Sequence, residues 1–304
     1  MIYRQEDRFM KIKKVIALML AASMVAAVAG CAKVKKITGA DFIAACEKMG
    51  AQEVEYDDAS ADVDEDAIED GIYCVLDSDD IEEIYEQYGS SSSSMMYGIS
   101  APDVDSIIEA DDIEEATVFA KVDQNMEDID DIEDIADLNV NAVIGVQLTL
   151  TDAGMVEQIM EGLADNLDEY DIDVEDLGSD EYYVGKNEGY LKIHVSVEDF
   201  LAAFAESETY GYIEDMGMDL EDAMDLTGDI CIATYINGEN VVVVIGASVN
   251  NSAEYLDEFC GYLGIPSPSK LGSNTMVAEA ICETIDNTIG AMLGAFASYD
   301  AYDY

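Results

Sequence analysis

The stretch ICIATYINGENVVVVIGA, residues 230–247, decides much of the fold because it places two apolar runs around an Asn-Gly pair. Asn and Gly both tolerate the positive φ angles of a two-residue hairpin turn, so this pattern predicts two antiparallel strands. A second hairpin is indicated where a strand at 182–184, a turn at 185–189 and a strand at 190–197 follow one another. Both hairpins favour a mainly antiparallel sheet.

Helices are expected on either side of these hairpins. Thr38 begins one helix and Thr151-Asp152 begins another over 153–167, because their side chains accept hydrogen bonds from the free N–H groups of a first turn. The acidic run 57–70 is expected to be a loop. Apolar spacing predicts further helices at 78–88, from Pro102 onward, and at 126–138, 253–263 and 273–296, with strands at 52–56, 72–76, 116–122 and 140–150. Helices mixed with antiparallel strands predict an α+β fold with packed helices.

An internal similarity suggests how the chain is divided. Residues 38–45 align with 196–203, each a capped helix start with Asp-Phe at the same place, which suggests two related units. Any capped amphipathic helix gives the same pattern, so coincidence is an equally good interpretation. We expect a first α+β unit at 38–125, a second at 126–297 that includes a C-terminal helix, and a disordered tail at 298–304.

The chain is strongly acidic. Its 304 residues include 68 acids and 13 bases, a net charge of −55. Residues 1–30 hold five of these bases and two of these acids, so residues 31–304 keep eight bases and 66 acids, a net charge of −58. This balance excludes nucleic-acid binding, which needs basic groups to displace counterions. Solubility and mutual repulsion explain the charge most simply, and attraction of cations or a basic protein partner is the alternative.

The number of cysteines does not indicate a disulfide framework. Five remain once Cys31 is set aside, and an odd number cannot all pair internally. Each of the five lies among apolar or small neighbours: Cys46, Cys74, Cys231, Cys260 and Cys282. Free cysteine behaves as a small hydrophobic residue, so we expect all five to be reduced core residues.

Residues 10–31 have the layout of a secretory signal peptide. Three lysines precede an uncharged apolar run at 15–30, which ends in small residues. This run of 16 residues is shorter than the roughly 20 that cross a bilayer, which disfavours a transmembrane helix. Its end, Val28-Ala29-Gly30-Cys31, resembles the lipobox of bacterial lipoproteins, with Val28 where that family usually has Leu.

The resemblance implies where the protein is located and how it is anchored. In that class the signal peptidase recognises Val28, Ala29 and Gly30 and cuts before Cys31, whose sulfur carries a diacylglycerol. Residues 1–30 would then be a signal peptide and residues 31–37 a lipid-attached tether. Because two acyl chains give firm anchoring, we expect an exported protein held on the outer face of the cell membrane.

No catalytic constellation stands out. His194 is the only histidine. Strand alternation groups it with Lys192 and Ser196, opposite an apolar face, so we expect an exposed strand histidine. A single histidine also excludes a zinc site built on several histidines. Carboxylate pairs of the kind used in glycoside hydrolysis are too abundant for any one pair to stand out.

Calcium is the best chemical alternative. Two acidic runs begin like EF-hand loops, one containing Asp62, Asp64 and Asp66, the other Asp171 and Asp173. Both lack the glycine at the sixth position and the glutamate at the twelfth that an EF-hand requires. They therefore predict only loose, weak cation binding.

The leading functional expectation is a non-enzymatic, lipid-anchored surface protein without a cofactor, which binds or interacts outside the cell. A cation-binding module that uses the acidic loops is the second interpretation. A hydrolase with a carboxylate pair is the third.

Overall fold

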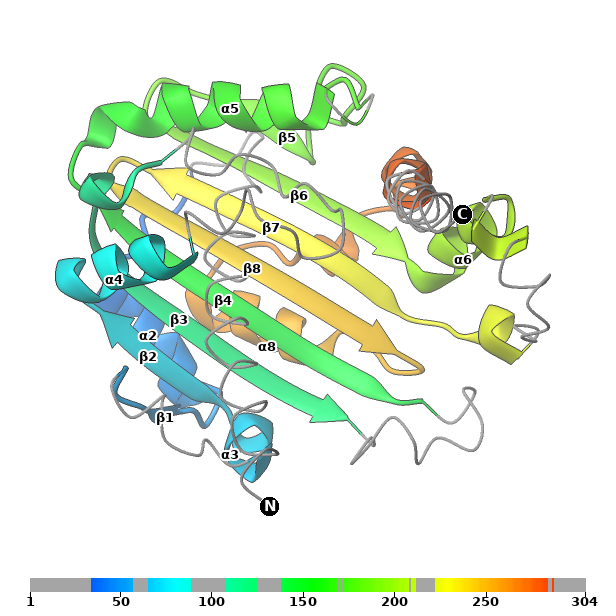
Figure 1. The fold of residues 1–304 in the computed structure, drawn as a ribbon, viewed down its shortest axis with the longest axis horizontal. Coiled ribbons are helices and arrows are strands. Elements are labelled where there is room, and N and C mark those ends of the chain that lie inside the picture. Colours follow the sequence, from blue (N-terminus) through cyan, green and yellow to red (C-terminus); the bar gives the residue numbers. More distant parts are fainter. Residues whose placement is uncertain are drawn as a thin grey trace, which may run out of the picture.

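The computed structural model describes residues 34–56, 65–88, 108–124, 138–168, 170, 172–207, 209–211, 222–283 and 286. Within this part of the chain, eight strands form one sheet in the order β1-β2-β3-β4-β8-β7-β6-β5, with helices on both faces (Figure 1). β1 and β2 are parallel, and every other neighbouring pair is antiparallel. The expected α+β fold with a mainly antiparallel sheet is confirmed.

The strands are β1 (Gln52–Glu53), β2 (Ile72–Leu76), β3 (Ile113–Gln124), β4 (Val140–Leu150), β5 (Tyr182–Val184), β6 (Glu188–Ser196), β7 (Asp229–Asn237) and β8 (Asn240–Val249). The helices are α2 (Gly39–Lys48), α3 (Glu65–Asp70), α4 (Ser78–Tyr88), α5 (Val156–Asp168), α6 (Val197–Ala205) and α8 (Glu254–Leu263). Short 3-10 turns are η4 (Ala110–Asp112), η7 (Ala153–Met155), η8 (Asp222–Asp225) and η9 (Pro268–Lys270). A further helical stretch covers 275–283.

The predicted Asn-Gly hairpin lies in the middle of the sheet as β7 and β8. Gly238 and Glu239 form its turn, and Gly238 has a φ of +61°, as the turn requires. β8 also pairs with β4, and β4 pairs with β3 along its whole length. The segments 38–125 and 126–297 therefore contribute to one continuous sheet.

Capping residues begin the helices where the sequence places them. The Thr38 hydroxyl accepts from Asp41 N, and Thr38 N donates to the Asp41 carboxylate at 3.1 Å, which closes a capping box. The Thr38 hydroxyl also donates to the Asp41 carboxylate at 2.8 Å, and this bond, together with the one from Thr38 N, lowers the pKa of Asp41. The Asp152 carboxylate accepts from Gly154 N, and the Ser196 hydroxyl caps α6. The predicted helix starts are confirmed at all three places.

α2 and α8 pack on one face of the sheet over a glycine. Phe42 of α2 and Phe259 of α8 meet edge to face, with ring centroids 5.4 Å apart. Phe119 of β3 stacks on Phe259 at 4.5 Å. A Cβ at Gly145 of β4 would lie 2.7 Å from Phe259 Cε1 and 2.8 Å from Phe42 Cζ, closer than side chains approach. The two helices can settle here only because β4 presents bare backbone.

Two local expectations are corrected. The strand expected at 52–56 is only the two-residue β1. The acidic run expected to be a loop ends in a helix, α3. Gly71 terminates this helix: its N–H donates to Ala67 O, and its φ of +100° is one that glycine adopts readily. A glycine just after the last helical residue is the signal that indicates this helix in the sequence.

The segment expected to be a tether, 31–37, is described from Val34 onward, and there it belongs to the folded domain. Val34 and Ile37 are 6% and 2% exposed. Lys35 Nζ donates to Leu263 O at the end of α8, and Asn237 Nδ2 donates to Val34 O. The chain is thus held in place from its first described residue.

Several expectations lie outside the described residues. These are the signal peptide 1–30, the lipobox and Cys31, the helix expected from Pro102, the helix expected at 126–138 except for its last residue, and the tail 298–304. The last helix is described at 275–283 and at residue 286. Within the described part of the chain, no helix has both the length and the apolar character needed to cross a bilayer.

Gly145→Ala tests the packing of α2 and α8. The new methyl group meets two phenylalanine rings, so we expect the free energy of unfolding to fall by about 1–3 kcal/mol, the usual cost of overpacking a core. Gly261→Ala on the exposed side of α8 is the matched control, because beyond the backbone of its own helix no atom lies within 4 Å of the new Cβ. Urea unfolding measures both, and equal effects of the two changes would contradict the close approach at Gly145.

Candidate functional site

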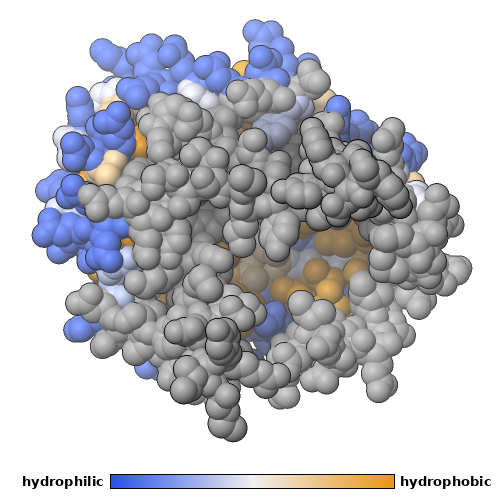
Figure 2. Space-filling model, in the orientation of Figure 1, coloured by the Kyte–Doolittle hydropathy of each residue, from blue (hydrophilic) through white to orange (hydrophobic). Residues whose placement is uncertain are grey.

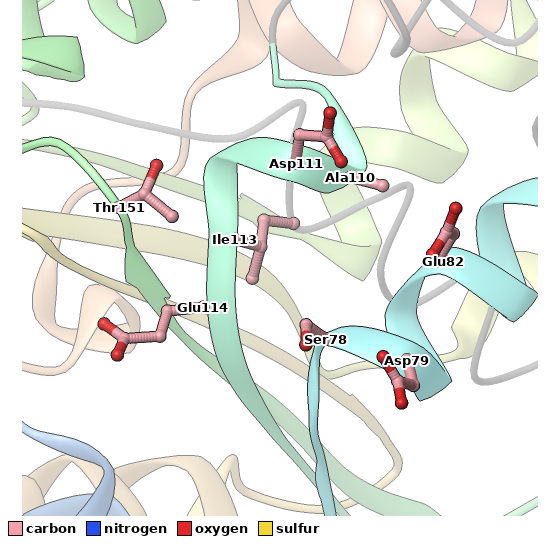
Figure 3. Close-up of a pocket in the computed structure, with 8 residues that line it drawn as sticks. All are labelled: Ser78, Asp79, Glu82, Ala110, Asp111, Ile113, Glu114 and Thr151. Carbon is pink, nitrogen blue, oxygen red and sulfur yellow. The ribbon is translucent and has the colours of Figure 1, made fainter.

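A pocket of about 390 Å³ opens at the end of the sheet where β3 begins and β4 ends. Thr151 N donates to Asp112 O at 2.9 Å, which ties the end of β4 to η4. The start of α4 forms the opposite wall. The described lining residues are Ser78, Asp79, Glu82, Ala110, Asp111, Ile113, Glu114 and Thr151 (Figure 3).

The pocket is acidic and open to solvent. The carboxylates of Asp79, Glu82, Asp111 and Glu114 border it, all four residues are exposed, and its described lining has no basic group. In Figure 3 these carboxylates point in different directions and not toward a common centre. The described residues contain no group of three or more His, Cys, Asp or Glu placed to share a metal ion. Figure 2 shows the same hydrophilic character on the described surface around α4 and α5.

The helix end beside the pocket is already capped. Asp77 Oδ1 accepts from Asp79 N and Asp80 N at 2.9 and 3.1 Å, and Asp77 N donates to the Asp80 carboxylate at 3.2 Å. The first N–H groups of α4 are therefore satisfied within the helix start. The pocket offers a ligand carboxylates and hydroxyls, which suits neither a phosphate nor a carboxylate ligand.

The residues proposed for calcium are only partly described. Asp62, Asp64 and Asp171 lie outside the described residues, and Asp66 lies in α3. Asp173 is exposed, and its Oδ1 accepts from Glu175 N at 2.8 Å, which forms a local turn. Its carboxylate thus has a structural partner within the acidic loop.

His194 corrects the expectation of an exposed strand histidine, because it is only 7% exposed. β5 pairs with β6 only as far as Leu191, which leaves the last part of β6 as a sheet edge. The segment 271–274 covers this edge: Asn274 N donates to His194 O at 2.7 Å, and Ser196 N donates to the Ser273 hydroxyl at 2.9 Å. Lys192 is buried as well, and burial lowers its pKa against the opposing pull of two nearby acids.

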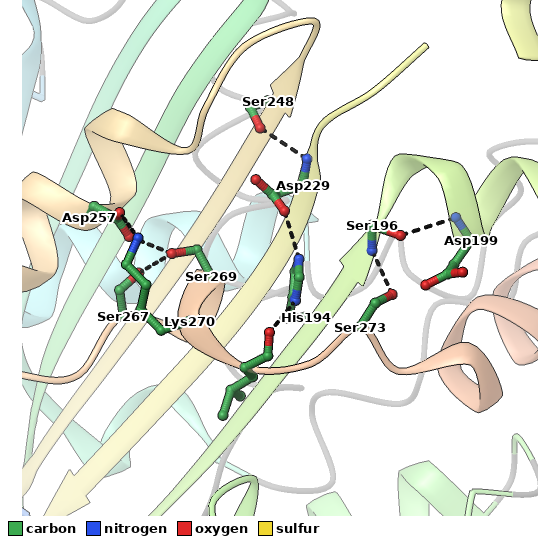
Figure 4. Close-up of polar contacts among 11 residues, drawn as sticks. His194, Ser196, Asp199, Asp229, Ser248, Asp257, Ser267, Ser269, Lys270 and Ser273 are labelled. Carbon is green, nitrogen blue, oxygen red and sulfur yellow. Dashed lines mark hydrogen bonds and ion pairs between the residues drawn. The ribbon is translucent and has the colours of Figure 1, made fainter. Parts of the chain in front are cut away.

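Both ring nitrogens of His194 face oxygen acceptors (Figure 4). Nδ1 lies 2.9 Å from Leu271 O, and Nε2 lies 2.7 Å from Asp229 Oδ1. Asp229 is in turn held by a hydrogen bond from its own N–H to the Ser248 hydroxyl. Neither nitrogen faces a hydroxyl or a thiol that it could activate, so this histidine ties β6, β7 and the segment 271–274 together.

A second polar cluster in Figure 4 also holds two segments of the chain together. Asp257 on α8 accepts from the Ser269 hydroxyl and pairs with Lys270, while the Ser267 and Ser269 hydroxyls lie 3.0 Å apart. Burial opposes ionisation of Asp257, but the hydrogen bonds from Lys270 and Ser269 outweigh it and keep its pKa below the ordinary value. The cluster fastens η9 to α8. Sequence reasoning missed it because the partners are 10 to 13 residues apart and share no motif.

The five cysteines expected in the core are confirmed as buried, and none of them is in a disulfide. Burial raises the pKa of Cys74 to about 11 and that of Cys260 to about 12. Burial also raises the pKa values of Cys46, Cys231 and Cys282. Thiols of this kind stay protonated near neutral pH and are poor nucleophiles.

His194→Phe tests the structural role of the ring. The substitution keeps a flat ring but removes both nitrogens that face Asp229 Oδ1 and Leu271 O, so we expect the free energy of unfolding to fall by about 1–3 kcal/mol. Amide hydrogen exchange at 271–274 should rise at the same time. His194→Gln keeps a side-chain N–H donor, so its unfolding free energy and its exchange should lie between those of the native chain and the Phe variant. Unchanged exchange at 271–274 in the Phe variant would contradict this role.

The buried thiols predict a loss of stability at alkaline pH. Their pKa values are raised on folding, so the unfolded chain releases protons first as pH rises above about 9. Each thiol then lowers the unfolding free energy by up to ~1.4 kcal/mol per pH unit, up to its folded pKa. Thermal melts between pH 8 and 11 measure the fall. Cys74→Ala should flatten it, and an identical pH slope in that variant would contradict the effect of burial.

Comparison with known proteins finds no match for this chain. No family model matches the chain. No curated protein matches it, and no solved structure does.

Proposed function

We propose that the chain is a bacterial lipoprotein, exported and acylated on Cys31, and that it works on the outer face of the cell membrane as a non-enzymatic binding or interaction module. One observation carries this proposal. Val28-Ala29-Gly30-Cys31 closes a segment that is basic at its start and then apolar, which is the layout of a lipoprotein signal.

The position of the folded domain is compatible with this anchor. The first described residue, Val34, is packed, and it follows Cys31 by three positions. Cleavage before Cys31 and acylation of its sulfur would therefore leave every described contact of the domain in place. The five other cysteines are buried and lie within the domain, so they do not compete for the lipid.

The described side chains support a role in binding more than one in catalysis. Both nitrogens of the only histidine are engaged by structural acceptors. The described thiols are buried and protonated, and the carboxylates around the pocket do not converge. With a net charge of −58 on residues 31–304, cations or a basic protein are the partners that the surface would attract.

Cys31→Ser tests the anchor. Expressed in a bacterium fed a labelled fatty acid, the native chain should take up the label, lose residues 1–30 and sediment with membranes. The variant should remain unlabelled and uncleaved, because the acceptor sulfur is gone. Cys282→Ala is the matched control and should behave like the native chain. A native chain that stays unlabelled and soluble would contradict the proposal.

A further inference from the structure

We infer that one end of the sheet is the surface that lies against the membrane, and that the strands lead away from the bilayer. This anchor end consists of residues 34–36, the β7–β8 turn at Gly238 and Glu239, and Leu263 at the end of α8. The inference rests on the proposed acylation of Cys31. It adds the lipid surface as a partner of a defined part of the domain.

The first described residues are pinned to this end at three successive positions. Val34 is 6% exposed, and its carbonyl accepts from Asn237 Nδ2. Lys35 Nζ donates to Leu263 O at 2.7 Å, and Lys36 forms an ion pair with Glu239. Ile37, 2% exposed, then enters the core. The chain therefore cannot peel away from the anchor end without losing buried contacts.

The remaining connection to the lipid is short. Cys31 precedes Val34 by three residues, and a fully extended chain covers at most about 3.6 Å per residue. The Cα atoms of Cys31 and Val34 therefore lie within about 11 Å of each other in any conformation of the residues between them. Because the acyl chains on Cys31 enter the bilayer, the anchor end stays within this reach of the headgroups.

The opposite end of the sheet lies much farther away. β4 has 11 residues, and a strand rises about 3.3 Å per residue, so its two ends are roughly 33 Å apart. Val140 pairs with Val249 at that far end, where β7 begins and α6 follows β6. Figure 1 shows the β7–β8 turn and α6 at opposite ends of the sheet.

The distribution of charge favours an upright orientation. Of the eight lysines in residues 31–304, Lys33, Lys35 and Lys36 fall within four consecutive positions that contain no acid. Lys186 lies in the neighbouring β5–β6 turn, next to Asn187, whose carbonyl accepts from Gly238 N. Acids predominate elsewhere, so an anionic bilayer repels the rest of the domain and attracts this short basic segment. The carboxylates that border the pocket lie at this same end of the sheet, and an upright domain keeps the acids of the other end farthest from the headgroups.

Two exposed reporter positions test the orientation. Lys186→Cys places a fluorophore at the anchor end, and Glu198→Cys places one on α6 at the far end. The native thiols are buried and react poorly, which leaves the new thiols as the labelling sites. The lipidated chains, residues 31–304, are reconstituted into phosphatidylcholine and phosphatidylglycerol vesicles that carry a nitroxide on the headgroup.

We expect strong quenching of the fluorophore at position 186 and little quenching at position 198. A flexible ten-residue Gly-Ser insertion between Ala32 and Lys33 should reduce this difference, because it frees the domain from its short connection. Equal quenching at both positions, or stronger quenching at 198, would overturn the orientation. Flotation of each sample with the vesicles separates the two claims: a chain that carries no lipid and does not float contradicts the lipoprotein proposal itself.

Discussion

The approach of two helices to bare strand backbone is the constraint on which the rest of the fold depends. Gly145 of β4 lies under Phe42 of α2 and Phe259 of α8, and a Cβ there would meet both rings. Gly246 of β8 has the same role under Leu256, because a Cβ there would lie 2.7 Å from Leu256 Cδ2. α2 settles on the sheet through this contact. Because residues 34–37 lead directly into α2, the same contact fixes where the chain enters the domain, and therefore where an anchor at Cys31 would hold it.

Local sequence signals predict much of this architecture. The Asn-Gly pair at 237–238 identifies the β7–β8 hairpin, and the side chains of Thr38, Asp152 and Ser196 mark helix starts that the structure confirms. These features are decided by residues within a few positions of each other, so the sequence displays them directly. The α+β class follows from their alternation along the chain.

The contacts that the sequence does not reveal are those between distant segments. His194 alternates as a surface residue would, yet residues 271–274, some 77 positions later, cover it. Val34 and Ile37 look like part of a tether, yet both are buried, and the hydrogen bonds of Val34 and Lys35 reach β7 and α8, more than 200 positions away. The pocket likewise joins α4, η4 and β3. No local pattern records which segments meet, and this is why the candidate site could be predicted only as an excess of carboxylates.

Several polar side chains of the described residues hold the structure together. His194 and Asp257 each bind a loop to the sheet or to a helix, and Asp77 caps α4. An acidic surface around such a frame suits a tethered binding module, whose function depends on where it is held and on what its charge attracts. The proposed function therefore depends most on the state of Cys31.

The intact mass of the native protein extracted from its bacterial membrane tests this state most directly. Acylation of Cys31 predicts the mass of residues 31–304 with a diacylglycerol on the first residue. An unmodified mass for residues 1–304 would contradict it.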